Sequence, residues 1–341
     1  MRTWDSFQFT IGMPHMVPDK LSEVELLKLL GAWQWDAIAR VLGCRSSKIA
    51  NGDGERLYAS FINVELNLPP PHGQDSFVEG DSVAGANTIA VFANKFVEGL
   101  LVFGHEAVPA DVTARVKSRD DLVWLEQPWG YMTNAFVARM GSNSKLKVFE
   151  PAGLASRPAE RMETLPAGIA EHQSVQATGA IADFGDGHGV PIVAQRSDPI
   201  VYPIMPESDV NGAGLLYFAR FVAIMNYGER VFLSDRLERP VSSPLLSCLA
   251  TERRRLYYFM NADPTDSVRI AVSASLLPRG PDAAPPLRRT LLKLLFRIDL
   301  YRGSDRVLMA SSLVRKALNV PAVEKGLIAE GERLLATLRP R

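Results

Sequence analysis

The sequence predicts an α+β protein that consists of two similar halves. The chain has 341 residues, which is long for one domain and suits two domains of about 150 residues each. Hydrophobic residues make up 47% and charged residues 22% of the chain, so there is enough apolar material for two packed cores. One long helix followed by several strands occurs twice along the chain.

The first half begins with residues 1–18, where a glycine and two prolines predict irregular structure. Apolar residues at helical spacing then predict a long helix over residues 21–42, which either Asp19 or Ser22 caps and Gly43 ends. The remainder of this half is rich in β-forming residues. We expect its strands at residues 57–68, 81–91, 94–103 and 132–140.

A long segment rich in glycine and proline separates the halves, and we expect a connection over residues 151–194 that contains a single helical turn. The pattern then restarts with a buried-looking helix over residues 211–230. We therefore expect an N-terminal domain of residues 1–150 and a C-terminal domain of residues 195–341. The second set of strands is expected at residues 254–260, 268–276, 291–301 and 306–314.

A shared tripeptide supports a duplication. Asp81-Ser82-Val83 follows a turn and opens a strand in the first half, and Asp266-Ser267-Val268 does the same in the second, at a similar distance from the helix. A long helix wrapped by an antiparallel sheet is the plan of the hot-dog fold. Two copies in one chain predict a double hot-dog protein with central helices and with two sheets joined edge to edge, which protects the strand edges.

Composition argues against several classes of partner and cofactor. The net charge is zero, with 38 basic and 38 acidic side chains, so no global field attracts nucleic acid or an anionic membrane. No apolar run reaches the roughly 18 residues that span a bilayer, and the N-terminus lacks the pattern of a signal peptide. The isolated thiols of Cys44 and Cys248 fit a reducing cytoplasm, and no spacing predicts a metal site.

Four strings of residues, in order along the chain, carry a resemblance to a known family. They are Gly12-Met13-Pro14-His15-Met16, Leu57-Tyr58-Ala59-Ser60-Phe61, Asn211-Gly212-Ala213-Gly214-Leu215 and Tyr257-Tyr258-Phe259-Met260-Asn261. Together these strings resemble the bifunctional acyltransferase/decarboxylase of the leinamycin pathway, and the resemblance spans most of the chain.

The resemblance implies a double hot-dog enzyme of natural-product biosynthesis, polyketides included. The founding activity of that family takes methylmalonyl-CoA, removes its carboxylate as CO2 and delivers the propionyl group to the thiol of an acyl carrier protein. The expected partners are thus an acyl-CoA and an acyl carrier protein, with no cofactor other than the coenzyme A thioester that is the substrate. We expect a cytoplasmic monomer, which is a pseudo-dimer of its halves, or a homodimer. Tyr58 matches the tyrosine implicated in catalysis by that family.

Tyr58 is also the first catalytic candidate by its own chemistry. It opens a strand after a glycine-rich turn, and its small neighbours Ala59 and Ser60 leave room for a substrate. A phenol can donate a hydrogen bond to a thioester oxygen on which negative charge develops, or it can act as a nucleophile beside a base. The alternative is a strand-end tyrosine whose hydroxyl reaches water.

A second group of candidates surrounds the start of the first helix. His15 lies in the loop before that helix, where it either orients a carboxylate and donates a proton or bonds to the backbone. Ser22 and Glu23 open the helix. They either cap it or bind substrate next to free N–H groups, which stabilise a developing oxyanion.

A third group comes from the second half. Asn211, Gly212 and Gly214 are expected to open the second helix, where the glycines let a pantetheine thioester approach the backbone. The alternative is simple capping by Asp209 or Asn211, with small residues for helix packing. Asn261 either binds substrate or forms a turn, and Tyr217 is expected in the core.

The densest basic run is Arg253-Arg254-Arg255. Together with Arg279, Arg288 and Arg289 it either meets an acidic carrier protein or the phosphates of coenzyme A, or it forms a solvated face.

Two other functions compete with decarboxylating acyl transfer. A hydrolase or dehydratase of the same fold would use an acid on the helix, and Glu23, Glu25 and His15 are its candidates. The hydrolase or dehydratase is distinguished by a carboxylate on the helix that points at the thioester, whereas a carboxylate that only caps the helix argues against it. A non-catalytic module that binds an acyl carrier protein would instead have a closed pocket without access to Tyr58.

Overall fold

The computed structural model describes residues 2–18, 20–143, 145–185, 189–193, 198–278 and 287–339. Within these residues the chain forms one 12-stranded sheet and a 2-stranded hairpin. The predicted domain boundary at residues 194–195 and Arg279 lie outside the described residues.

The strand order of the large sheet mirrors one half of the chain onto the other. From edge to edge the order is β1 (Asp5–Thr10), β5 (Ser82–Phe92), β6 (Phe96–Gly104), β7 (Trp129–Arg139), β4 (Tyr58–Asn67), β11 (Leu249–Tyr258), β14 (Leu308–Pro321), β13 (Arg288–Arg302), β12 (Ser267–Leu277) and β10 (Ile200–Pro203). The short strands β8 (Leu146–Val148) and β9 (Val190–Ile192) pair with β7 and β12. The two half-sheets are therefore joined edge to edge through β4 and β11, as the sequence predicts.

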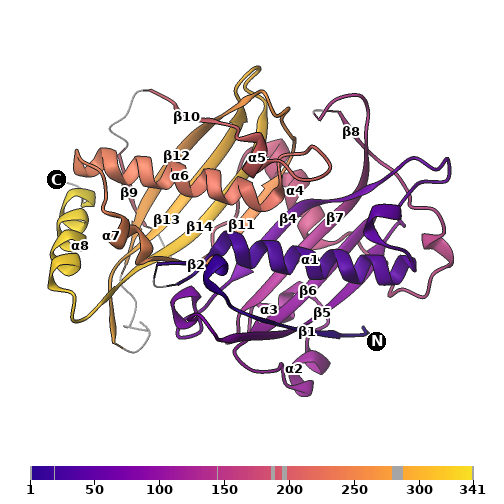
Figure 1. Ribbon diagram of the computed structural model, residues 1–341, viewed down its shortest axis with the longest axis horizontal. Coiled ribbons are helices and arrows are strands. Elements are labelled where there is room, and N and C mark those ends of the chain that lie inside the picture. The colour runs from indigo at the N-terminus through magenta and orange to yellow at the C-terminus, as the bar shows by residue number, and fades with distance from the viewer. Residues whose placement is uncertain are drawn as a thin grey trace.

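One long helix from each half lies across the same face of the sheet (Figure 1). α1 (Glu23–Leu42) and α6 (Phe218–Leu237) have 20 residues each and contact one another. The Ser22 hydroxyl accepts a hydrogen bond from Glu25 N at 3.4 Å, and Gly43 ends α1 with a φ of 64°, which glycine adopts without strain. Of the two predicted caps Ser22 is confirmed and Asp19 lies outside the described residues, and the predicted end of the helix at Gly43 is confirmed.

The second helix begins seven residues later than the predicted Asn211, because Asn211 forms a turn. Its side-chain oxygen accepts hydrogen bonds from Ala213 N at 2.9 Å and Leu215 N at 3.1 Å, and Gly214 has a φ of 73°. Side-chain bonds of this kind compete with helical backbone bonds. The glycines therefore belong to a loop that precedes Phe218, and the prediction that they open the helix is wrong.

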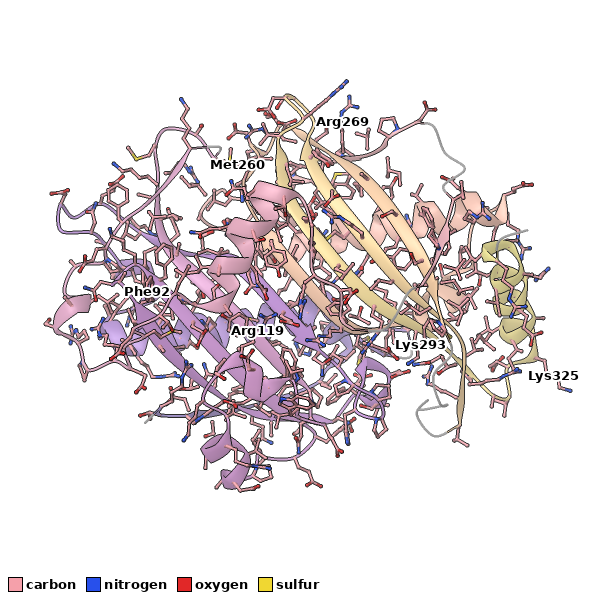
Figure 2. All side chains as sticks on the ribbon, turned by 180° about the vertical axis from the view of Figure 1, so that it is seen from behind. Phe92, Arg119, Met260, Arg269, Lys293 and Lys325 are labelled. Carbon is pink, nitrogen blue, oxygen red and sulfur yellow. The ribbon has the colours of Figure 1, made fainter. Side chains whose placement is uncertain are left out.

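The connection between the halves is more ordered than the sequence predicts. It contains α4 (Ala167–Thr178), a helix of 12 residues, where a single turn was expected. α4 packs against β4, β7 and β11 on the face of the sheet opposite α1 and α6, which Figure 2 views from behind. Its Glu171 accepts a hydrogen bond from the Tyr257 hydroxyl at 2.7 Å. Tertiary contacts of this kind stabilise a helix whose apolar pattern is weak.

Short elements complete the described fold. Two of them, β1 and the hairpin of β2 and β3, include residues 5–10 and 16–17, which were predicted to be irregular. The helices are α2 (Ala110–Arg115), α3 (Arg119–Leu122), α5 (Pro206–Asp209), α7 (Ser243–Ser247) and α8 (Lys325–Leu338); the hairpin pairs β2 (Met16–Val17) with β3 (Lys20–Leu21); and the 3-10 turns are Met13–His15, Ser46–Lys48, Gln74–Ser76 and Leu154–Ser156.

The largest apolar cluster extends through both halves and joins α1, α6 and the inner faces of both half-sheets. The shared tripeptide lies where the sequence places it, since β5 begins at Ser82 and β12 at Ser267. The predicted domain limits stay a prediction. No described helix combines the length and the apolar character that crossing a membrane requires.

Candidate active site

A cavity of about 260 Å³ opens where β4 and β11 separate. The two strands pair only from Asn63↔Tyr257 to Asn67↔Arg253. Where this pairing ends, β4 shifts its register with β7, between Phe61 and Asn63. The loop that precedes α6 spans the opening. The lining residues are Trp35, Ile38, Ser46, Ser47, Ile49, Arg56, Leu57, Tyr58, Ala59, Ser60, Phe61, Leu146, Asn211, Leu215, Leu216, Tyr217, Phe218, Phe221, Tyr258, Phe259, Met260 and Asn261.

Aromatic side chains form one wall of the cavity. The rings of Phe61 and Phe218 lie 4.2 Å apart, and Trp35 lies 5.5 Å and 5.7 Å from them. The Phe218 ring reaches α1 only because residue 31 is glycine: a Cβ there would lie 2.5 Å from Phe218 Cζ. This wall excludes water from one side of the cavity.

Tyr58 lies in this cavity, half-buried at the first position of β4. Its hydroxyl makes no hydrogen bond with the described part of the chain, so the group is available to a substrate. The Arg56 guanidinium carbon lies 4.9 Å from the centre of the Tyr58 ring. Ser60, two residues after Tyr58 on the same strand, also lines the cavity. The structure thus brings together the predicted residues Tyr58 and Ser60 and adds Arg56. The position of Arg56, two residues before Tyr58, is the signal by which the sequence could have identified it.

The amides of Asn211 and Asn261 line the cavity, and both are used to shape it. Asn261 Oδ1 accepts a hydrogen bond from Leu216 N at 2.9 Å, and its Nδ2 donates to Leu216 O at 3.1 Å. This pair of bonds holds the loop that carries Asn211 across the opening. Gly212 and Gly214 belong to that loop and are not among the residues of the cavity wall.

Two tyrosines of the cavity were missed by the sequence analysis. The Tyr258 hydroxyl donates to Phe218 O at 3.1 Å, and burial raises the pKa of this phenol well above its usual value. Burial, with a smaller effect of Glu25, raises the pKa of Tyr217 to about 12. Tyr217 packs against the main apolar cluster, as predicted, and it also lines the cavity. Both phenols are therefore neutral near pH 7, and Tyr217 can donate a hydrogen bond to a ligand.

The candidates around the start of α1 lie away from this cavity. His15 Nδ1 accepts a hydrogen bond from Gly12 N at 2.9 Å, which is the backbone alternative. Ser22 caps α1, and Ile38 is the α1 residue furthest along the helix that lines the cavity. At about 1.5 Å per residue, Ser22 and Ile38 are roughly 24 Å apart along the axis. The structure therefore does not bring His15, Ser22 and Glu23 together with Tyr58.

β4 and β11 pair from Asn63↔Tyr257 to Asn67↔Arg253, and we call this junction the β4–β11 seam. Glu23 lies at the end of the seam opposite the cavity. Its carboxylate accepts hydrogen bonds from Arg254 Nε at 2.5 Å and Thr251 Oγ1 at 2.8 Å. Burial alone would raise the pKa of Glu23, but the attraction of Arg254 and Lys316, together with the hydrogen bonds from Arg254 and Thr251, outweighs burial and lowers the pKa to about 2. Gln74 bridges the same end, because its amide donates to Leu21 O at 3.0 Å and accepts from Thr251 N at 2.7 Å. This end of the seam is closed.

The basic run of β11 is buried and paired, so neither the docking role nor the solvated face is correct. Arg254 turns toward Glu23, while Arg253 and Arg255 bind Glu65 on the other face of the sheet at 2.7 Å and 3.0 Å. Arg119, labelled in Figure 2, also binds Glu65, at 2.5 Å. These attractions lower the pKa of the Glu65 carboxyl although burial opposes them. Arg289 pairs with Glu332 at 3.6 Å.

No carboxylate or imidazole lines the cavity in the described residues, and these residues hold no cluster of three or more metal-ligating side chains. The polar groups of the lining are hydroxyls, amides and the Arg56 guanidinium. Such a set can donate hydrogen bonds to an oxyanion. It contains no ordinary general base.

Comparison of the sequence with models of protein families gives no match, and comparison with curated proteins gives no significant match. Solved structures do match. An oleoyl thioesterase from Lactobacillus plantarum, so described, superposes with a TM-score of 0.51 at 10% identity, covering 94% of this chain and 98% of its own. The 12:0-ACP thioesterase from Umbellularia californica gives 0.50 at 10% identity, over 92% and 93%.

At this identity the likeness is one of fold. The predicted class, α+β with two hot-dog units in one chain, is confirmed. The thioesterases named here extend over nearly the whole chain, so the helix-wrapped sheet of both halves is matched. The more specific resemblance to acyltransferase/decarboxylases stays a prediction.

Proposed function

We propose that this protein is an acyl-thioester enzyme that works in the cavity between β4 and β11, with Tyr58 as its catalytic phenol. The observation that carries the proposal is the half-buried hydroxyl of Tyr58, free of partners in the described chain, beside an aromatic wall. A phenol in this setting can donate to the oxygen of a thioester as negative charge develops. One such donor typically contributes about 10²–10³ in rate.

Decarboxylating acyl transfer is the reaction that this lining supports best. A malonyl-type thioester would lose CO2, and the electron pair of the broken C–C bond would form an enolate whose oxygen accepts a hydrogen bond from Tyr58. The α-carbon would then take a proton. The acyl group would finally move to the thiol of a carrier protein, and coenzyme A would leave as the thiol. The aromatic wall of Trp35 and Phe218 excludes water from this side of the cavity, which strengthens the hydrogen bond between the enolate oxygen and Tyr58.

The resemblance to the leinamycin-type family supports methylmalonyl-CoA as the substrate, an acyl carrier protein as the partner and natural-product biosynthesis as the setting. It also supports a cytoplasmic enzyme without a cofactor, either monomeric or homodimeric. Tyr58, the residue matched to that family's catalytic tyrosine, lines the cavity.

Hydrolysis of an acyl thioester is the second candidate, because the matching folds include thioesterases. It would require a base that activates water. Glu23 is held by Arg254 and Thr251 at the closed end of the seam, and Glu25 bonds to Lys28 at 2.8 Å. A non-catalytic carrier module is less well supported, since the cavity reaches Tyr58.

The test is a product analysis with methylmalonyl-CoA and holo-acyl carrier proteins. Intact-mass spectrometry of the carrier is expected to detect a propionyl adduct, with release of CO2 and free coenzyme A. Hydrolysis would instead yield free coenzyme A and an unloaded carrier. If methylmalonyl-CoA, propionyl-CoA and longer acyl-CoAs all remain intact with every carrier, the protein is not an acyl-thioester enzyme.

A further inference from the structure

Arg56 differs from the arginines of the neighbouring strand. Arg253, Arg254 and Arg255 of β11 are all paired with carboxylates. Arg56 lines the cavity with an exposed side chain and makes no ion pair with the described residues. Its neighbour Glu55 is turned elsewhere, since its Oε2 accepts a hydrogen bond from Asn51 at 3.2 Å. A cation in the cavity wall is thus left for a ligand.

The position of Arg56 is fixed close to the catalytic phenol. Residues two apart on a strand point to the same side, so Arg56 and Tyr58 project together. The backbone of Arg56 forms a bridge with Ala50, and Leu57 N donates to Ile49 O at 2.8 Å. The guanidinium carbon lies 4.9 Å from the Tyr58 ring centre. The free charge therefore stands beside the thioester end of a bound substrate and not beside its phosphates.

We propose that Arg56 selects acyl groups that carry a carboxylate next to the thioester. This inference rests on the proposed function. In a malonyl-type acyl group the carboxylate carbon is two single bonds from the thioester carbon, roughly 2.5 Å away, so a thioester at Tyr58 brings it within reach of Arg56. The planar guanidinium binds such a carboxylate through two hydrogen bonds, whereas a neutral acyl group offers it no partner.

The experiment measures selection by binding, without any turnover. The probes are unreactive thioether analogues of malonyl- and acetyl-N-acetylcysteamine, which carry no phosphate, so only the acyl carboxylate differs in charge. Dissociation constants for the two are compared by ligand-observed NMR. The wild-type protein is expected to prefer the malonyl analogue, and Arg56→Gln is expected to reduce that preference about tenfold. Arg56→Lys should keep part of it, and Arg56→Glu should reverse it.

Two matched controls separate a specific contact from a general field. Arg45 and Lys48 are exposed cations that flank Ser46 and Ser47 at the rim of the same cavity but are not among its lining residues. Arg45→Gln and Lys48→Gln should leave the malonyl preference unchanged. All variants should unfold at the wild-type temperature, because exposed substitutions cost little stability.

An unchanged preference in Arg56→Gln overturns the inference, and so does an equal loss in the Arg45→Gln or Lys48→Gln controls. A shift confined to Arg56 in a protein that turns over no thioester contradicts the proposed function and leaves Arg56 as a carboxylate receptor. If neither analogue binds the wild-type protein, both proposals fail.

Discussion

The two ends of the β4–β11 seam are equivalent in the repeat but opposite in polarity. Glu65 and Arg255 pair at the centre of the seam, and the residues four positions before them are Phe61 and Thr251. At one end the Phe61 ring packs 4.2 Å from Phe218, the first residue of α6. At the other end Thr251 donates a hydrogen bond of 2.8 Å to Glu23, the first residue of α1.

The same contrast recurs further along the helices. The twelfth residue of α1 is Gln34, whose amide donates to Asn134 at 3.1 Å. The twelfth residue of α6 is Glu229, which forms an ion pair with Lys316. Asn134 and Lys316 are the strand partners of Phe61 and Thr251. At these matched positions one end of the duplicated fold is therefore neutral and aromatic, and the other is ionic.

The bridging amides explain why only one of these two ends is open. The Asn261 side chain forms two hydrogen bonds to Leu216 and accepts a third from its neighbour Ala262 N at 3.0 Å, so it holds the loop without reaching β4. Gln74, whose side chain is one methylene longer, bonds to Leu21 and also reaches Thr251 on β11. The comparison teaches that a duplicated fold can seal one of two equivalent gaps with buried polar bonds and keep the other as a cavity.

Removing the central cation of the closed end should have the largest effect. Arg254→Met leaves the buried carboxylate of Glu23 without its guanidinium partner, and breaking a buried pair in this way typically costs about 3–5 kcal/mol of unfolding free energy. Denaturant titration measures it. The exposed pair of Arg289 and Glu332 provides the control, because Arg289→Met should cost less than about 1 kcal/mol. Equal costs would mean that the ionic network does not stabilise the closed end.

Removing the phenol of the open end should stop catalysis and spare the fold. Tyr58→Phe keeps the ring and deletes one oxyanion donor, so kcat should fall by about 10²–10³ with methylmalonyl-CoA. The unfolding free energy should change by no more than about 1 kcal/mol. Tyr227→Phe, on α6 outside the cavity lining, is the matched control and should retain the wild-type rate. A Tyr58→Phe protein that turns over normally would remove Tyr58 from the mechanism.

The bridging amides offer a smaller and sharper comparison. Gln74→Ala deprives Thr251 N and Leu21 O of buried partners, which should cost about 2 kcal/mol in chemical denaturation and leave thioester binding intact. Asn261→Ala should cost a similar amount and also weaken thioester binding, because it frees the loop over the cavity. Identical binding defects in both variants would contradict the assignment of one open and one closed end.

The closed end should also give a signature at high pH. Burial, with a smaller effect of Lys316, lowers the pKa of Lys20 to about 8, against an ordinary value of 10.5. Between these values the unfolded chain binds more protons at this site, so the contribution of Lys20 to the unfolding free energy rises with pH, by at most about 1.4 kcal/mol per unit. Lys20→Met should remove that rise from urea titrations. A slope that is unchanged in the variant would exclude Lys20 as its source.

The sequence predicted those elements whose signals are local. The apolar period, Ser22 and Gly43 fixed α1, and the Asp-Ser-Val turns marked β5 and β12. The prediction failed at Asn211, because its side chain forms hydrogen bonds within a turn and such a turn leaves no trace in the spacing of apolar residues. It also failed at α4, because that helix is stabilised by tertiary contacts such as the hydrogen bond between Glu171 and Tyr257. Of the candidate site residues, Tyr58, Ser60, Asn211 and Asn261 meet in one cavity.

The sequence by itself determined the two-fold repeat and its class, because helical and strand periods depend only on the order of apolar residues. The tertiary structure alone decided which candidates share a site. His15 and Tyr58 both lie in motifs that suggested a catalytic residue, yet Tyr58 lines the cavity and His15 lies before the far end of α1, bonded to Gly12 N. The basic run of β11 looks like a docking surface until Glu65 and Glu23 are placed beside it. Pairing between residues that are distant in sequence is set by packing, which no local pattern encodes.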